Sequence, residues 1–205
     1  MSAPPPDGTR QRLLRAALDL YTSVGFRATT TPMIAQRAGV AEGTIYRHFG
    51  GKEELLNEAY RGAQRWLVGL AEEIRGERHG SVAELLRRLG RRLVEAAERD
   101  PAGVRMALQW REERYLDERS REVAREFRAT LQQAVAAGKS DGLVRAGPAE
   151  LWASVWLAVV GFAAERVGNR EWPLDHPQVG LTLEAAWDAI AARRDDSAGR
   201  TGEVG

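Results

Sequence analysis

The stretch of residues 25–56 constrains the fold of this 205-residue chain more than any other. Gly25 favours the end of an incoming helix, because glycine adopts the left-handed conformation at little cost. Thr31 and Pro32 favour the start of a new helix, with Thr31 as its cap and Pro32 in its first turn. Gly39 then ends this helix and permits a tight turn. The spacing therefore predicts two short helices joined by a turn, which is a helix-turn-helix.

A second short helix is expected at about residues 42–49, and its apolar positions determine how it faces. Ile45 and Phe49 lie four residues apart, so they share the buried side. The opposite side offers a guanidinium fork, a hydroxyl and a position without a side chain, which suit a helix that contacts base edges in DNA. The residues on that side are Arg47, Thr44 and Gly43, and the flanking residues are Tyr46 and His48. A small polar surface helix is the alternative for the Tyr-Arg-His run alone, but the whole ordered set favours a DNA-binding helix.

The same stretch resembles the DNA-binding domain of the tetracycline-repressor (TetR) family of bacterial transcriptional regulators. The resemblance forms one ungapped run in roughly the first quarter of the chain. The matching residues are Gly25-Phe26, Ala28-Thr29-Thr30, Ile34-Ala35, Ala38-Gly39-Val40, Gly43-Thr44-Ile45-Tyr46, His48-Phe49 and Lys52-Glu53-Glu54-Leu55-Leu56. Two positions depart from the family pattern. Ala41 stands where the family usually has a Ser or Thr cap, a loss of about 1 kcal/mol, and Gly51, a tolerable cap, replaces the usual cap before Lys52.

Phosphate contacts are expected from Thr31, Tyr46, His48 and Lys52. Lys52 begins the helix that follows the DNA-reading helix, where its charge and the helix N-terminus both attract phosphate. The net charge of the whole chain is only +1, so its cationic groups have to be well placed rather than numerous. The resemblance implies double-stranded operator DNA as the partner.

Helical periodicity continues through the rest of the chain, and no strand pattern competes with it. We therefore expect an all-α protein, with a three-helix helix-turn-helix domain over residues 9–56. A larger helical domain for ligand binding and dimerisation is expected over residues 57–193. A disordered N-terminal arm is expected over residues 1–8 and a disordered tail over residues 194–205.

Residues 151–164 carry no charge on any side, so both faces of this expected helix should be buried. One face can pack within the chain, and the other requires a partner. Together with the last helix, it would form a four-helix interface in a homodimer. The candidate interface residues are Val155, Val159, Leu183 and Trp187. A helix buried inside a monomer is the alternative, and the resemblance favours the dimer.

The resemblance also implies a pocket for a small hydrophobic ligand inside the C-terminal helical domain. Such pockets are mostly apolar and aromatic, with few polar groups. The candidate lining residues are Trp66, Met106, Trp110, Phe127, Leu131, Trp156 and Phe162. For each residue taken singly, an ordinary place in the core is the stronger interpretation.

Other classes of function find no support in the residues. The chain has no cysteine, its three histidines lie far apart, and no phosphate-binding loop or nucleophile motif is present. We therefore expect no metal, no cofactor and no enzymatic activity. No uncharged run reaches the roughly 18 residues that span a membrane, and the N-terminal residues lack the features of a signal peptide. A cytoplasmic protein without membrane contact is expected.

The resulting hypothesis is a dimeric, sequence-specific transcriptional regulator. The favoured form of this hypothesis is a repressor that a small hydrophobic ligand releases from a palindromic operator. An activator of the same architecture fits the sequence equally. The alternative from another class is an all-helical small-molecule-binding or enzymatic protein in which the N-terminal motif is only structural.

Overall fold

The computed structural model of the chain describes residues 6–76, 80–110 and 112–193. Within these residues the chain is helical, and its only β-type pairing is an isolated bridge between Val144 and Ala191. The all-α prediction is therefore confirmed. The expected tail lies outside the described residues, as does most of the expected N-terminal arm. The first helix already begins at Pro6, inside the stretch expected to be disordered.

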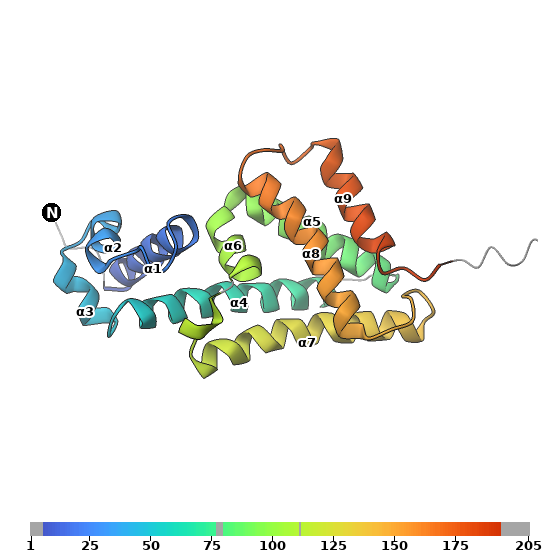
Figure 1. Cartoon of the computed structure of the whole chain (residues 1–205), viewed down its shortest axis with the longest axis horizontal. Coiled ribbons are helices and arrows are strands. Elements are labelled where there is room, and N and C mark those ends of the chain that lie inside the picture. The colour runs from blue at the N-terminus through green and yellow to red at the C-terminus, as the bar shows by residue number, and fades with distance from the viewer. Residues whose placement is uncertain (1–5, 77–79, 111, 194–205) are drawn as a thin grey trace, which may run out of the picture.

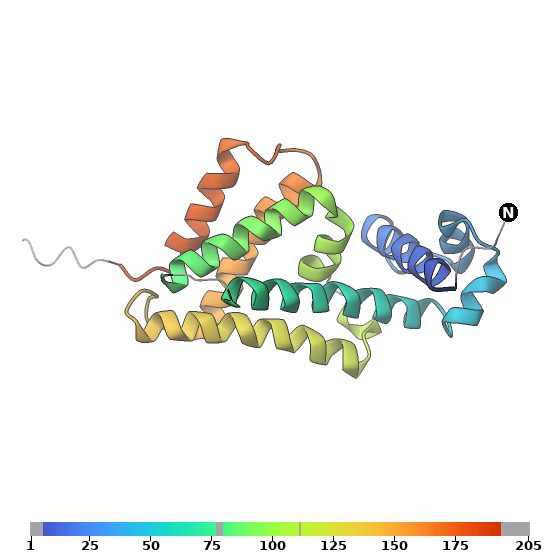
Figure 2. The ribbon, with the colours of Figure 1, turned by 180° about the vertical axis from the view of Figure 1, so that it is seen from behind.

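The helices form a small head and a larger body. The head contains α1 Pro6–Ser23, α2 Thr31–Ala38, the 3-10 turn η1 Glu42–Thr44 and α3 Ile45–His48. The body contains α5 Val82–Arg99, α6 Pro101–Gln109, the 3-10 turn η2 Glu113–Tyr115, α7 Glu118–Ser140, α8 Ala149–Gly168 and α9 Pro177–Asp188. The long helix α4 Lys52–Gly76 runs from the head into the body, and α7 lies beside it in both views (Figures 1 and 2).

The core of the head is continuous with the body. Side chains of α1, α2, α3 and the start of α4 pack together in one apolar cluster, with members such as Leu13, Ile34, Ile45, Leu55 and Leu56. The body residues Met106, Leu116 and Ala124 belong to the same cluster. The head is therefore held against α6 and α7 by apolar contacts as well as by its covalent link to α4.

Helix α5 lies at the centre of the body, where it packs against α8 and α9. Gly90 makes this close approach possible, since a Cβ atom added there would lie 3.1 Å from Leu183 Cδ2 and 3.3 Å from Val160 Cγ2. Leu183 is accordingly buried inside its own chain. This corrects its expected place at a dimer interface, because its side chain fills the gap above Gly90 and does not face outward.

Helix α8 has one buried side and one uncovered apolar side. Its inner side includes the buried residue Trp156, whereas Leu151 and Phe162 are exposed, and Leu181 of the neighbouring α9 is 62% exposed. Among the described residues α8 alone is long and apolar enough, by length and composition, to cross a membrane. One such helix is weak evidence for a span, and the packing of α8 on α5, α7 and α9 is that of a core helix with a further face to cover.

Candidate nucleic-acid interface and body cavity

Helix α2 begins and ends close to where the sequence predicts, but a different threonine caps its start. The side chain of Thr30, and not that of Thr31, caps α2 by accepting a hydrogen bond from the Met33 N–H at 3.4 Å. Gly39 ends the helix in the left-handed conformation with φ of 65°, as only glycine does at little cost. Thr31 therefore occupies the first turn of α2, and its hydroxyl lies 3.3 Å from Glu42 Oε1 and 3.4 Å from the Tyr46 hydroxyl. The start of α2 is thus joined to the second helix at the surface.

We call residues 42–49 the reading segment. The segment is a 3-10 turn followed by a four-residue α-helix instead of one regular helix. Ala41 makes no side-chain capping bond, as expected from its methyl group. Ile45 and Phe49 are buried in the head core, so the predicted orientation of the segment is confirmed. The order of this short segment comes from those two anchors, because an isolated helix of this length is not stable in water.

The outward face of the reading segment carries the residues expected there. Tyr46, Arg47 and Gly43 are exposed, whereas Thr44 and His48 are half-buried. The Arg47 guanidinium lies 3.4 Å from the Thr44 hydroxyl, which aligns the two side chains on one side. A Cβ atom added at Gly43 would meet nothing within 4 Å, so the backbone there is open to close approach. The face combines a fork-shaped donor, hydroxyls and an open backbone position, the groups that bind base edges and phosphates.

The Lys52 ammonium group is bound within the head, whereas the sequence predicts that it is free to bind a DNA phosphate. Its ammonium group donates to the carbonyl oxygens of Phe26 and Thr29 at 3.0 and 2.9 Å. The same group lies 4.4 Å from the centroid of the Phe26 ring. Lys52 therefore holds the loop between α1 and α2 on the start of α4. The sequence did not indicate this role, because Lys52 lies 26 residues from Phe26 and nothing in the pattern pairs them.

A polar cluster that the sequence does not indicate joins α4 to the start of α7, with Asn57, Arg61 and Ser120 buried and Asp117 exposed. Asn57 accepts hydrogen bonds from the Asp117 N–H at 2.8 Å and from the Ser120 hydroxyl at 2.7 Å. The guanidinium of Arg61, which is only 5% exposed, donates to the Asp117 carboxylate at 2.8 Å and to Glu58 at 3.1 Å. No sequence motif carries this signal, since the partners on the two helices lie about 60 positions apart.

The charges in this cluster shift the acidity of its carboxylates. Burial by itself would raise the pKa of Asp117, but hydrogen bonds from Ser120 and the guanidinium of Arg61 outweigh it and hold the pKa below its usual range. The pKa of Glu58 is lowered in the same way, with burial opposed by Arg10 and Arg61. Both carboxylates are therefore ionised at neutral pH and keep α4, α1 and α7 tied together.

Tyr115 connects the body directly to the helix-turn-helix. Its ring centroid lies 4.4 Å from that of Phe26, and its hydroxyl accepts a hydrogen bond from Arg27 at 3.0 Å. Its carbonyl oxygen accepts a hydrogen bond from the Asn57 amide at 2.9 Å. The short segment before α7 therefore contacts both α4 and the loop that precedes α2.

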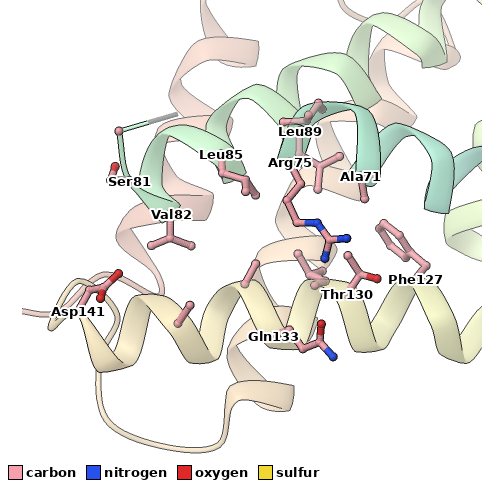
Figure 3. Close-up of a pocket in the computed structure, with 15 residues that line it drawn as sticks. Ala71, Arg75, Ser81, Val82, Leu85, Leu89, Phe127, Thr130, Gln133 and Asp141 are labelled. Carbon is pink, nitrogen blue, oxygen red and sulfur yellow. The ribbon is translucent and has the colours of Figure 1, made fainter. Parts of the chain in front are cut away.

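The body contains a cavity of about 400 Å³ between α4, α5 and α7. Figure 3 shows it bounded by α5 above and α7 below, with α4 at one side. Its walls are mainly apolar, and the polar side chains at its edge are Arg75, Ser81, Thr130, Gln133 and Asp141. The volume lies within the range of about 300–1,000 Å³ that small-molecule sites occupy.

The structure does not bring the seven expected pocket residues into one site. Phe127 and Leu131 line the cavity between α4, α5 and α7. Leu131 and Phe162 line a separate groove between α7 and α8, and Trp66 lines a third hollow between α1 and α4. Met106 and Trp156 are packed core residues, and Trp110 is half-buried and donates its indole N–H to the Glu112 carbonyl oxygen. The aromatic side chains were expected together, but they fill helix contacts in different parts of the protein.

The head has the features of a helix-turn-helix DNA-binding protein. These features are a tight glycine turn, a short helix anchored by two apolar residues, and an exposed polar face. Residues 13–59 match the family described as bacterial regulatory proteins, tetR family. The helix-turn-helix segment of the chain is therefore that of the TetR family. In the part of the chain that the structure describes, no group of three or more His, Cys, Asp or Glu side chains is placed to hold a metal ion.

Similar proteins extend this comparison. The chain is 40% identical over 80 residues to the HTH-type transcriptional repressor KstR2 of Rhodococcus jostii (strain RHA1), and the match covers 36% of this chain and 39% of that relative. The chain thus spans well under half the length of this curated relative. The crystal structure of a TetR family transcription regulator from Marinobacter aquaeolei VT8 superposes with a TM-score of 0.77 and 24% identity, over 91% of this chain and 97% of the other. The SmeT–triclosan complex superposes with a TM-score of 0.66 and 22% identity, over 92% and 93% of the two chains. These structures show that the fold of head and body together is shared.

Proposed function

We propose that this protein is a dimeric transcriptional repressor that binds a near-palindromic operator and leaves it when a small molecule enters the body. The observation that carries the proposal is the exposed face of the reading segment, with Arg47, Thr44 and Gly43 outward and Ile45 buried behind them. Arg47 binds a guanine edge in this proposal, which is the commonest specific contact of arginine in the major groove. Thr31, Tyr46 and His48 bind the flanking phosphates. The name of the matched relative KstR2 as a repressor supports the direction of regulation.

The proposed dimer interface is the uncovered apolar face of α8 and α9. Val155, Val159 and Trp187 are only half-buried, and Phe162 and Leu181 are exposed beside them. A second copy placed on this face by a two-fold axis would remove these apolar side chains from water. In such a dimer the two reading segments would enter successive major grooves, about 34–36 Å apart.

The proposed ligand site is the cavity between α4, α5 and α7. The SmeT–triclosan complex, a similar fold, contains a small organic molecule, which supports a ligand-responsive body. To weaken operator binding a hundredfold, the ligand must prefer the DNA-incompetent shape by about 2.7 kcal/mol.

The proposed coupling runs along α4 and the start of α7. Phe127 and Leu131 of α7 line the cavity, and the cap residue of the same helix, Asp117, is bound to Arg61 of α4. A ligand that moves α7 relative to α4 therefore displaces Tyr115. Because the Tyr115 ring contacts Phe26, the loop between α1 and α2 of the head moves with it. A shift of either head changes the separation of the two reading segments, so both cannot remain in successive grooves.

The test begins with selection of bound sequences from a random pool of duplex DNA by the full chain. A symmetric consensus is expected, and the fluorescence polarisation of that duplex then gives the affinity. Arg47→Ala should weaken binding by about 1–3 kcal/mol and relax the preference at one position of each half-site. Arg65→Ala, on the exposed side of α4, is the matched control and should leave both unchanged. Failure to enrich any sequence would instead favour an all-helical protein in which the motif is only structural.

A further inference from the structure

Arg75 gives the cavity between α4, α5 and α7 an electrostatic polarity. Its side chain extends from α4 across the cavity toward Thr130 of α7 (Figure 3). Among the described residues, no carboxylate lies within ion-pair distance of its guanidinium. Asp141, the C-cap residue of α7, lies at the opposite end of the cavity.

The wall between these two ends is apolar and continuous. Leu85, Leu89 and Val82 of α5 form one side, and Leu131 and Ala134 of α7 form the other. A ligand that fills this space needs an apolar chain or ring system to replace water along the wall. Of the neutral polar residues of α7 that line the cavity, Thr130 lies beside the Arg75 guanidinium, whereas the Gln133 side chain projects away from it (Figure 3).

We propose that the cavity takes a hydrophobic carboxylate, with its anionic group on Arg75 and its apolar chain along α5 and α7. A guanidinium matches a carboxylate through two parallel hydrogen bonds, which a neutral hydroxyl or an amine does not reproduce. The inference rests on the proposed ligand-responsive function for its role in regulation, but the chemistry of the site stands on the cavity alone. Arg75 thereby selects the charge of the ligand, and the walls select its shape.

The experiment compares three probes that share a ten-carbon chain and differ in charge: decanoate, 1-decanol and decylammonium. Binding to the DNA-free full chain at neutral pH is measured by isothermal titration calorimetry. Decanoate is expected to bind about five- to tenfold more tightly than decanol, the range of a partly exposed charge-assisted hydrogen bond, and decylammonium more weakly than either. Arg75→Gln should reduce decanoate affinity to that of decanol and leave decanol unchanged.

Two further variants keep the test decisive. Arg65→Gln removes the same charge from the same helix at a site outside the cavity and should bind all three probes like the parent. Ala134→Trp should fill the cavity and abolish binding of both decanoate and decanol, with the helical circular dichroism retained. Equal affinity for decanoate and decanol, tighter binding of decylammonium, or undiminished decanoate binding in Arg75→Gln would each overturn the inference.

Failure here and failure of the proposed function give different results. A chain that prefers decanoate but selects no DNA sequence would retain the carboxylate site and lose the regulator. A chain that binds its operator but releases it only with neutral compounds would remain a regulator and lose the carboxylate site.

Discussion

Replacement of Lys52 by methionine tests whether this lysine stabilises the fold or binds a DNA phosphate. The substitution retains the aliphatic stem and removes the charge. It deletes the hydrogen bonds to the Phe26 and Thr29 carbonyl oxygens, at 3.0 and 2.9 Å, and the cation–π contact with Phe26. Each charge-assisted bond contributes about 1.5–3 kcal/mol, and the cation–π contact about 0.5–1 kcal/mol. Because the site is half-buried and water can reach the freed carbonyls, we expect a net loss of about 2–3 kcal/mol.

The assay for Lys52→Met is urea unfolding followed by circular dichroism, at the same protein concentration as the parent. Operator affinity is then measured as a function of salt. If Lys52 acts through the loop alone, the slope of log affinity against log salt stays close to that of the parent. A phosphate contact would instead reduce the slope by about 0.9. Arg47→Ala is the control and should change operator binding but not the unfolding free energy. Unchanged stability in Lys52→Met, together with a reduced salt slope, would refute the structural role.

Three further predictions concern the body. Leu181→Glu should convert the dimer into a monomer of unchanged helicity in analytical ultracentrifugation, whereas Glu184→Gln on the same helix should not; a monomeric parent protein would contradict the interface. Gly138→Ala should destabilise the protein by about 1–3 kcal/mol in urea, because the new Cβ would lie 2.5 Å from Val82 Cγ1, and unchanged stability would contradict this crowding. The lowered pKa of Asp117 contributes stability that is complete above its usual pKa of about 3.9 and is lost as the pH falls through the lower value of the folded state. Asp117→Asn should therefore lose less stability than the parent as the pH falls below about 4, and equal losses would exclude this carboxylate as the cause.

The local parts of the fold were predictable from the sequence because local rules determine them. Gly39 requires the left-handed conformation, and the spacing of Ile45 and Phe49 fixes the orientation of the reading segment. The sequence pattern predicts the cap of α2 at Thr31, one residue too late, because Thr30 and Thr31 are chemically equivalent in the pattern.

Features that depend on distant contacts were not predictable. The resemblance implies one pocket in the body, but Trp156 is core, Trp66 borders α1, and of the seven candidate residues only Phe127 and Leu131 reach the central cavity. Arg75, at the end of α4, carried no periodic signal that distinguished it from other surface arginines. Leu183 matched an outward apolar pattern, and only the missing side chain of Gly90 reveals why it points inward.

The brevity of α3 has a consequence for the dynamics of DNA recognition. A four-residue helix without a side-chain cap has no stability of its own, so its amide hydrogens are protected only while Ile45 and Phe49 remain in the head core. Its local opening should therefore require opening of that core as a single cooperative unit. In native-state hydrogen exchange, the amide of Phe49 should exchange with the same free energy as that of Leu56 in α4. The head thus meets DNA with its reading segment already ordered, and core substitutions far from DNA, such as at Leu13, can alter recognition by raising the population of the open state.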